Sequence, residues 1–142
     1  MSADQNRQLG LRWLATAEQD IQTARWLRQG EYFNTACFQA QQASEKALKA
    51  FLLSQGERGV RGHATLELLN RCVELRPDFE TLRQHCRVLD RHYIPTRYPD
   101  ALPDATPHEA FGPEDADDAI RRAEAILQAV RDAIGEIDAA RG

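Results

Sequence analysis

The nine residues HYIPTRYPD, numbered 92–100, combine side chains that could bind a charged ligand. Pro95 and Pro99 stiffen the chain around Arg97 and Tyr98, because a proline ring fixes its own φ angle and restricts the residue before it. A guanidinium held in a fixed place suits phosphate recognition, since its fork of N–H donors matches the oxygens of a phosphate. We therefore expect Arg97 and Tyr98 to contribute to a ligand-binding site.

A structural role would also explain these two residues. Arg97 could pair with an acid such as Glu45 or Asp100, and Tyr98 could fill a gap between helices, because ordered loops need such contacts. The sequence leaves both possibilities open.

Arg87 and His92, separated by four residues, form a second candidate site. Such a pair could cleave RNA without a metal, with the imidazole moving the proton of the 2′-hydroxyl and the guanidinium stabilising the phosphate charge. On a continuous helix the two side chains would point about 140° apart. They could converge if the helix ends near Tyr93, or if a second subunit supplies the partner group. Alternatively, His92 and His85 are surface or partly buried histidines.

A third candidate is a polar stripe made of Gln39, Gln42, Lys46 and Lys49, which share one side of a predicted helix. Two lysines about a turn apart can hold a phosphate, although such a stripe is also typical of a solvated helix face. Glu45 is placed to pair with Lys49 one turn further on.

The sequence predicts no metal site and no cofactor. A long loop with four prolines is predicted at residues 94–112. Its acids and histidine lack the spacing of known metal ligands; they are Asp100, Asp104, His108 and Glu109. The cysteines are far apart and form no CxxC pattern, so we expect buried free thiols at Cys37, Cys72 and Cys86.

The lysine stripe must be positioned by a helix through residues 36–53, which contain neither glycine nor proline. Its apolar arc is wider than that of an ordinary surface helix, which predicts contact with two or more neighbours. Small side chains on this arc would let other backbones approach closely; they include Ala36, Ala40, Ala43, Ala47 and Ala50.

Four further helices are predicted from apolar positions at helical spacing. The first covers residues 9–29 and another covers 65–75, before Pro77. The next begins with Asp78 as its N-cap and carries a seam of Phe79, Leu82, Cys86, Leu89 and Tyr93. The last begins at Pro113 and extends its apolar stripe to Ile137. No stretch shows strand alternation, so we predict an all-α fold, a compact up-and-down bundle of four main helices plus a shorter helix.

The overall composition is that of an ordinary globular protein, with 142 residues, 42% hydrophobic and 28% charged. We expect residues 1–142 to form a single domain. The net charge of -4 provides no basic footprint for nucleic acid. No apolar run approaches the roughly 20 residues that span a bilayer, and the N-terminus lacks the apolar core of a signal peptide. We therefore expect a cytoplasmic protein with no membrane partner.

Two stretches together resemble the HEPN domain family. They are EYFNTACFQAQQASEKALKAFLL and YIPTRYPDA, the second of which is followed by a loop and an amphipathic helix with an acidic start. The segment GHATLELL around His63 fits the family's stretch before its third helix. The resemblance extends from about Leu11 to Ile134, almost the whole chain.

This resemblance implies a helical bundle that is usually a homodimer and commonly partnered with a minimal nucleotidyltransferase, often in a toxin–antitoxin pair. It also suggests binding of a nucleotide or RNA. Many members of the family are metal-independent ribonucleases that bring an Arg and a His together in a dimer cleft. That pattern transfers to Arg87 and His92, although Val88 stands where the ribonuclease branch normally has a polar residue.

The YIPTRYPD form of the family implies that Arg97, Tyr98 and Asp100 are binding or structural residues, and Lys46 and Lys49 match the family's EKALKA segment. Our leading expectation is a non-catalytic or weakly active HEPN module that binds a nucleotide, RNA or a nucleotidyltransferase partner through these residues. The alternatives are a ribonuclease toxin and a module that serves only protein–protein assembly.

Overall fold

The computed structural model describes residues 1–141, and the side chains of residues 1–136. The described part is all-α and contains no strand. It contains α1 (Ala3–Gln29), α2 (Phe33–Ser54), α3 (Thr65–Leu75), the 3₁₀ helix η1 (Pro77–Leu82), α4 (Arg83–Asp90), the 3₁₀ helix η2 (Pro99–Ala101), α5 (Pro107–Ala110) and α6 (Pro113–Arg141). The predicted fold class is therefore confirmed.

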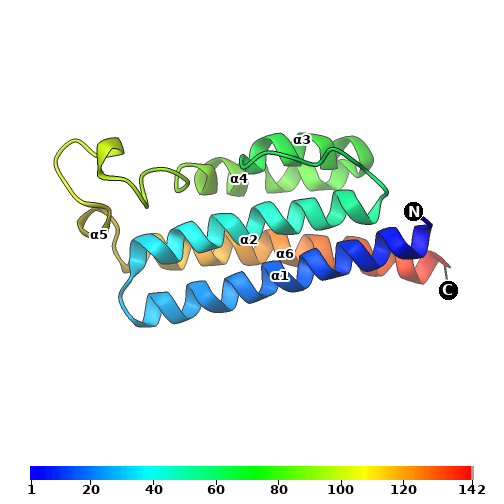
Figure 1. Ribbon diagram of the computed structural model, residues 1–142, viewed down its shortest axis with the longest axis horizontal. Coiled ribbons are helices and arrows are strands. Elements are labelled where there is room, and N and C mark those ends of the chain that lie inside the picture. The colour runs from blue at the N-terminus through cyan, green and yellow to red at the C-terminus, as the bar shows by residue number, and fades with distance from the viewer. Residues whose placement is uncertain (142) are drawn as a thin grey trace.

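Helix α2 is central to the bundle. Figure 1 shows α1 on one side of it, α3 and α4 on the other, and α6 behind α1 and α2. The five alanines predicted to permit close packing are all fully buried. The prediction of a helix with several neighbours is therefore confirmed.

The N-terminal half of α1 approaches α2 very closely at Gly10. A Cβ atom there would lie 2.6 Å from the Cβ of Ser54 and 2.7 Å from the carbonyl oxygen of Ala50. Helix α1 also begins six residues earlier than predicted, because Ser2 and Gln5 form a capping box in which each side chain bonds the other's backbone N–H.

The predicted fourth helix is two elements, and Asp78 is not its N-cap. Pro77 opens the 3₁₀ helix η1, Asp78 lies in its first turn, and α4 begins only at Arg83. Proline at the first position favours a turn that starts there, so the N-cap position falls on Arg76. Four of the five predicted seam residues, Phe79, Leu82, Cys86 and Leu89, are buried as predicted. The fifth, Tyr93, lies beyond the end of α4 and is half-buried.

Ion pairs join the end of α1 to the start of α6. Arg28 donates to both carboxylate oxygens of Asp117 at 2.8 and 3.2 Å, and Arg25 pairs with Glu124. The side chain of Ile137 lies outside the described residues. Among the helices of residues 1–141, none combines the length and the apolar character needed to cross a membrane.

Candidate functional site

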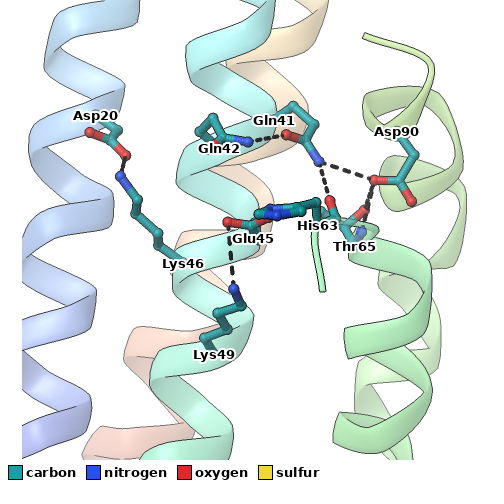
Figure 2. A network of polar contacts seen from close by, with 9 residues as sticks. All are labelled: Asp20, Gln41, Gln42, Glu45, Lys46, Lys49, His63, Thr65 and Asp90. Atoms are coloured by element: carbon teal, nitrogen blue, oxygen red, sulfur yellow. Dashed lines mark hydrogen bonds and ion pairs between the residues drawn. The ribbon is translucent and has the colours of Figure 1, made fainter. Parts of the chain in front are cut away.

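The carboxylate of Asp90, the last residue of α4, caps the start of α3. It accepts hydrogen bonds from the backbone N–H groups of Thr65 (2.8 Å) and Leu66 (3.0 Å) and from the Thr65 hydroxyl (2.7 Å). The residue at the N-cap position, Ala64, has no side chain that could do this. Asp90 therefore fixes α3, and the residues before it, to the end of α4 (Figure 2).

Gln41 of α2 fixes the backbone just before α3. Its side chain is fully buried, and its amide donates to the carbonyl oxygen of His63 at 2.7 Å and, more weakly, to Asp90 at 3.4 Å. Its own carbonyl oxygen accepts from Gln42 at 2.7 Å. Because all the polar atoms of this buried amide have partners, the position of His63 relative to α2 is well determined.

One turn along α2, the buried carboxylate of Glu45 holds the His63 ring. Glu45 Oε1 lies 2.8 Å from His63 Nδ1, and Glu45 Oε2 lies 3.7 Å from Lys49 Nζ, so the predicted Glu45–Lys49 pair is confirmed. An ionised carboxylate can only accept, so His63 Nδ1 donates this hydrogen bond. Lys49 is itself largely buried, with its ammonium 5.8 Å from the ring centre of Trp13.

The His63 ring stacks on Tyr93, which in turn contacts Arg97. The His63 and Tyr93 ring centres are 5.4 Å apart, with 18° between the planes. The Arg97 guanidinium carbon lies 4.4, 4.5 and 5.0 Å from the ring centres of Phe38, Tyr93 and Tyr98. A series of direct contacts thus connects Lys49 on α2 with Arg97 in the loop after α4.

Arg97 is held by aromatic rings and by one backbone hydrogen bond, from its Nε to the carbonyl oxygen of Tyr93 at 2.9 Å. It forms no ion pair with Glu45, Asp100 or any other acid among residues 1–136. The remaining guanidinium N–H groups therefore keep their capacity to bind an anion. Tyr98 is 50% exposed beside it, and Asp100 is exposed one turn further on.

The loop that carries Arg97 is attached to the bundle through Thr96, which is 1% exposed. The Thr96 hydroxyl donates to the carbonyl oxygen of His92, and its own carbonyl oxygen accepts from the Asn34 amide at 3.0 Å. A buried hydrogen-bonded threonine thus positions the arginine that follows it.

Lys46, by contrast, turns toward α1. Its ammonium lies 2.6 Å from Asp20 Oδ2, on the side of α2 away from His63 (Figure 2). The predicted lysine pair is therefore divided between two internal acids, Asp20 for Lys46 and Glu45 for Lys49.

Arg87 and His92 lie in different surroundings. Arg87 is exposed and donates to the Gln84 side chain at 2.8 Å. His92 follows the end of α4, and its ring packs edge-on against Phe111 with 5.6 Å between ring centres. Burial lowers the pKa of His92 despite the nearby carboxylates of Asp115 and Asp118, so its imidazole is neutral near pH 7. Its buried Nδ1 has no hydrogen-bond partner among the described residues.

The three cysteines are buried and unpaired, as predicted. Burial raises the pKa of Cys37 to about 12 and that of Cys86 to about 11, and it raises the pKa of Cys72 further. These thiols are therefore packing groups and not nucleophiles. Within residues 1–136, no group of three or more histidines, cysteines or acids is placed to hold a metal ion.

Sequence analysis alone did not identify His63, Asp90 or Gln41 as parts of this site. The segment GHATLELL contains one usable signal, because a helix whose N-cap position is alanine requires a capping group from elsewhere. The contact between His63 and Tyr93, thirty positions apart by number, has no local signature.

Comparisons with known proteins agree with this architecture. Residues 11–133 match the HEPN domain family. A curated relative from Methanocaldococcus jannaschii, named "Putative toxin MJ1304", is 25% identical over 139 residues, which cover 87% of each chain. The chain's partner and substrate do not follow from that name.

Three solved structures share the fold. TT1696 from Thermus thermophilus is 36% identical with a TM-score of 0.79, covering 87% of this chain and 96% of that one. The archaeal HEPN homologue ST0689 is 37% identical with a TM-score of 0.73, covering 88% and 97%. The HEPN domain protein tm0613 from Thermotoga maritima is 27% identical with a TM-score of 0.68, covering 87% and 98%. With the family match spanning most of the sequence, the chain belongs to the HEPN domain family.

Proposed function

We propose that this protein is a cytoplasmic HEPN module that binds a nucleotide or RNA through Arg97 and Tyr98. It would act as a homodimer together with a minimal nucleotidyltransferase in a toxin–antitoxin pair. The observation that carries this proposal is the guanidinium of Arg97, which three aromatic rings hold in place and no described acid neutralises.

The chemistry of this surface suits a nucleotide. The free N–H groups of a guanidinium bind phosphate oxygens, and stacking between a base and an aromatic ring contributes roughly 1–3 kcal/mol in single-stranded nucleic-acid complexes. The half-exposed ring of Tyr98 could provide such a stacking surface beside Arg97. Asp100, one turn further on, could accept a hydrogen bond from a ribose hydroxyl or a base amino group.

We assign Lys46 and Lys49 a supporting role in this site. Both ammonium groups are occupied by acids of the same chain, and Lys49 is also largely buried. They would place Glu45 and α1 correctly and would not bind the ligand directly.

Substitution of Arg97 tests the binding proposal. Arg97→Ala should weaken binding of a labelled oligoribonucleotide, or of ATP, by tenfold or more, as expected for the loss of charge-assisted hydrogen bonds. Arg91→Ala is a matched control, because Arg91 is an exposed arginine at the end of α4. Unchanged affinity in Arg97→Ala with an intact circular dichroism spectrum would disprove the proposed site. Failure of the wild-type protein to bind either probe would favour a pure assembly module.

A metal-independent ribonuclease using Arg87 and His92 is a second candidate. Two observations favour it. One is the name of the M. jannaschii relative, and the other is the neutral imidazole of His92 with its unpartnered Nδ1, since a general base must be unprotonated. Because Arg87 bonds Gln84 and His92 packs against Phe111 in this chain, we expect the catalytic pair to be completed across a dimer.

RNA cleavage in the presence of a chelator tests this candidate. If Arg87 and His92 are catalytic, Arg87→Ala and His92→Ala should each abolish cleavage by the purified dimer. Cleavage that continues undiminished in both variants would remove these residues from the mechanism, and absence of cleavage by the wild type would leave the binding function alone.

A further inference from the structure

We infer that His63, held by Glu45, is a second ligand contact of the Arg97 site and binds a phosphate oxygen of the same nucleotide or RNA. This inference rests on the binding function proposed above and specifies its ligand, which would carry at least two phosphate groups. A nucleoside polyphosphate and the backbone of single-stranded RNA both have this chemistry.

The first argument is the combination of exposure and restraint at His63. The side chain is 65% exposed, yet the residue is held at three points. Its ring is bonded to Glu45 at Nδ1 and stacks on Tyr93, and its backbone carbonyl oxygen accepts from Gln41. An exposed side chain ordinarily keeps its rotamer freedom, so restraint by buried groups pre-organises it. Its second ring nitrogen, Nε2, has no hydrogen-bond partner among the described residues and is available to a ligand.

The second argument is the placement of a carboxylate beneath an exposed imidazole. The Glu45 side chain is only 5% exposed, and removing a carboxylate from water is unfavourable unless its partners offset the cost. Apolar residues of similar size often stabilise a core as well as a buried ion pair does. A buried acid that fixes one nitrogen of a histidine is, however, the usual device for orienting the other nitrogen toward a ligand.

The third argument is the shared contact with Tyr93. His63 stacks on the Tyr93 ring, and the Arg97 guanidinium lies 4.5 Å from the centre of the same ring. Two groups that can bind a phosphate are therefore held by one aromatic side chain, and successive phosphates of one ligand could engage both.

A phosphate contact through His63 would use Nε2, because Nδ1 is already bonded to Glu45. The charged groups near the ring are Glu45 and Lys49 on α2 and Arg97 in the loop after α4.

The test measures binding of ATP and of a labelled oligoadenylate to the wild-type protein, to Arg97→Ala and to four further variants. His63→Gln should lower the affinity about tenfold, and Glu45→Gln, which removes the charge that orients the ring, should show a similar loss. His63→Arg, which places a planar charged group next to Tyr93, should bind at least as tightly as the wild type. His108→Gln, at an exposed histidine on α5, should behave as the wild type does.

The outcomes separate this inference from the proposed function. If Arg97→Ala weakens binding while His63→Gln and Glu45→Gln bind as the wild type does, the Arg97 site stands and the His63 contact is wrong. Unchanged binding by Arg97→Ala would overturn both. A Tm for each variant shows whether it is folded, and His63→Arg restoring affinity excludes loss of structure as the cause. A loss confined to ATP or to oligoadenylate identifies which source of phosphates the site takes.

Discussion

The His63–Arg97 region and the Arg87–His92 pair both contain an arginine and a histidine, yet they differ in how these groups are held. His63 is exposed and held at three points, and Arg97 is enclosed by three aromatic rings. Arg87 is exposed with one amide partner, and the His92 ring packs against Phe111. Arg87 and His92, which are near each other in the sequence, have different contacts. His63 and Arg97, which are far apart in the sequence, both contact Tyr93.

The reason lies in the end of α4. The helix stops at Asp90, and the following turns run into a loop whose Thr96 is buried. As a result, His92 packs against Phe111, just before α6, and Arg97 packs against Phe38 on α2. The four predictions below test this comparison.

The largest effect on stability should come from substitution of Asp90. This residue lies between Arg87 and His92 in the sequence, but its carboxylate holds the start of α3, next to His63. Asp90→Ala leaves the backbone N–H groups of Thr65 and Leu66 without their acceptor, and the Thr65 hydroxyl keeps only the Cys86 carbonyl oxygen at 3.2 Å, so we expect the free energy of unfolding to fall by about 3 kcal/mol in urea denaturation. Asp104→Ala, at an exposed acid of the long loop, should change it by less than about 0.5 kcal/mol. Equal stability of the two variants would contradict the capping role.

Removal of the buried carboxylate should have the next largest effect. Glu45→Ala leaves the Lys49 ammonium largely buried without its acid, which we expect to cost about 2 kcal/mol in the same measurement. The double variant Glu45→Leu/Lys49→Met should recover most of that stability, because the uncompensated charge is gone. It should not recover ligand binding, since His63 would still lack its orienting acid. Recovery of both properties would mean that Glu45 serves packing alone.

A smaller effect on stability should come from the pH dependence that the buried His92 contributes. Because burial lowers the pKa of His92 in the folded protein, the unfolded chain binds more protons around and below the ordinary pKa of 6.5. The free energy of unfolding should therefore decrease as the pH falls from 7 through this range. His85, whose pKa is also lowered, chiefly by burial, contributes in the same direction.

His92→Phe tests this prediction, because it keeps a ring against Phe111 and removes the titrating group. Its stability should depend less on pH between 7 and 5 than that of the wild type. An unaltered slope in His92→Phe would show that the imidazole is not buried in the neutral form.

The smallest effect should come from Arg87. Among the described residues its exposed side chain bonds Gln84 alone, so Arg87→Ala should change the free energy of unfolding by less than about 0.5 kcal/mol. A larger loss that appears only at high protein concentration would place Arg87 at an interface between copies of the chain. That result would strengthen the ribonuclease candidate.

Much of the fold could be predicted because its signals are local. Helix α3 has the predicted bounds, and the buried seam of Phe79, Cys86 and Leu89 follows from spacing alone. The predicted cap at Asp78 was wrong because Pro77 competes for the start of the same helix. Of the predicted site, Arg97 and Tyr98 lie together at the surface as the stiff loop indicated, but the two lysines are divided between Asp20 and Glu45.

The sequence by itself determined most of the helices, the alanine-rich packing of α2, the burial of the thiols and the family, because each depends on periodicity, composition or a contiguous motif. Only the tertiary structure decided which charges remain free, because a charged side chain is neutralised by whichever partner the packing brings near. The packing places Asp20 beside Lys46 and Glu45 beneath His63, and it gives Arg97 three aromatic neighbours and no described acid.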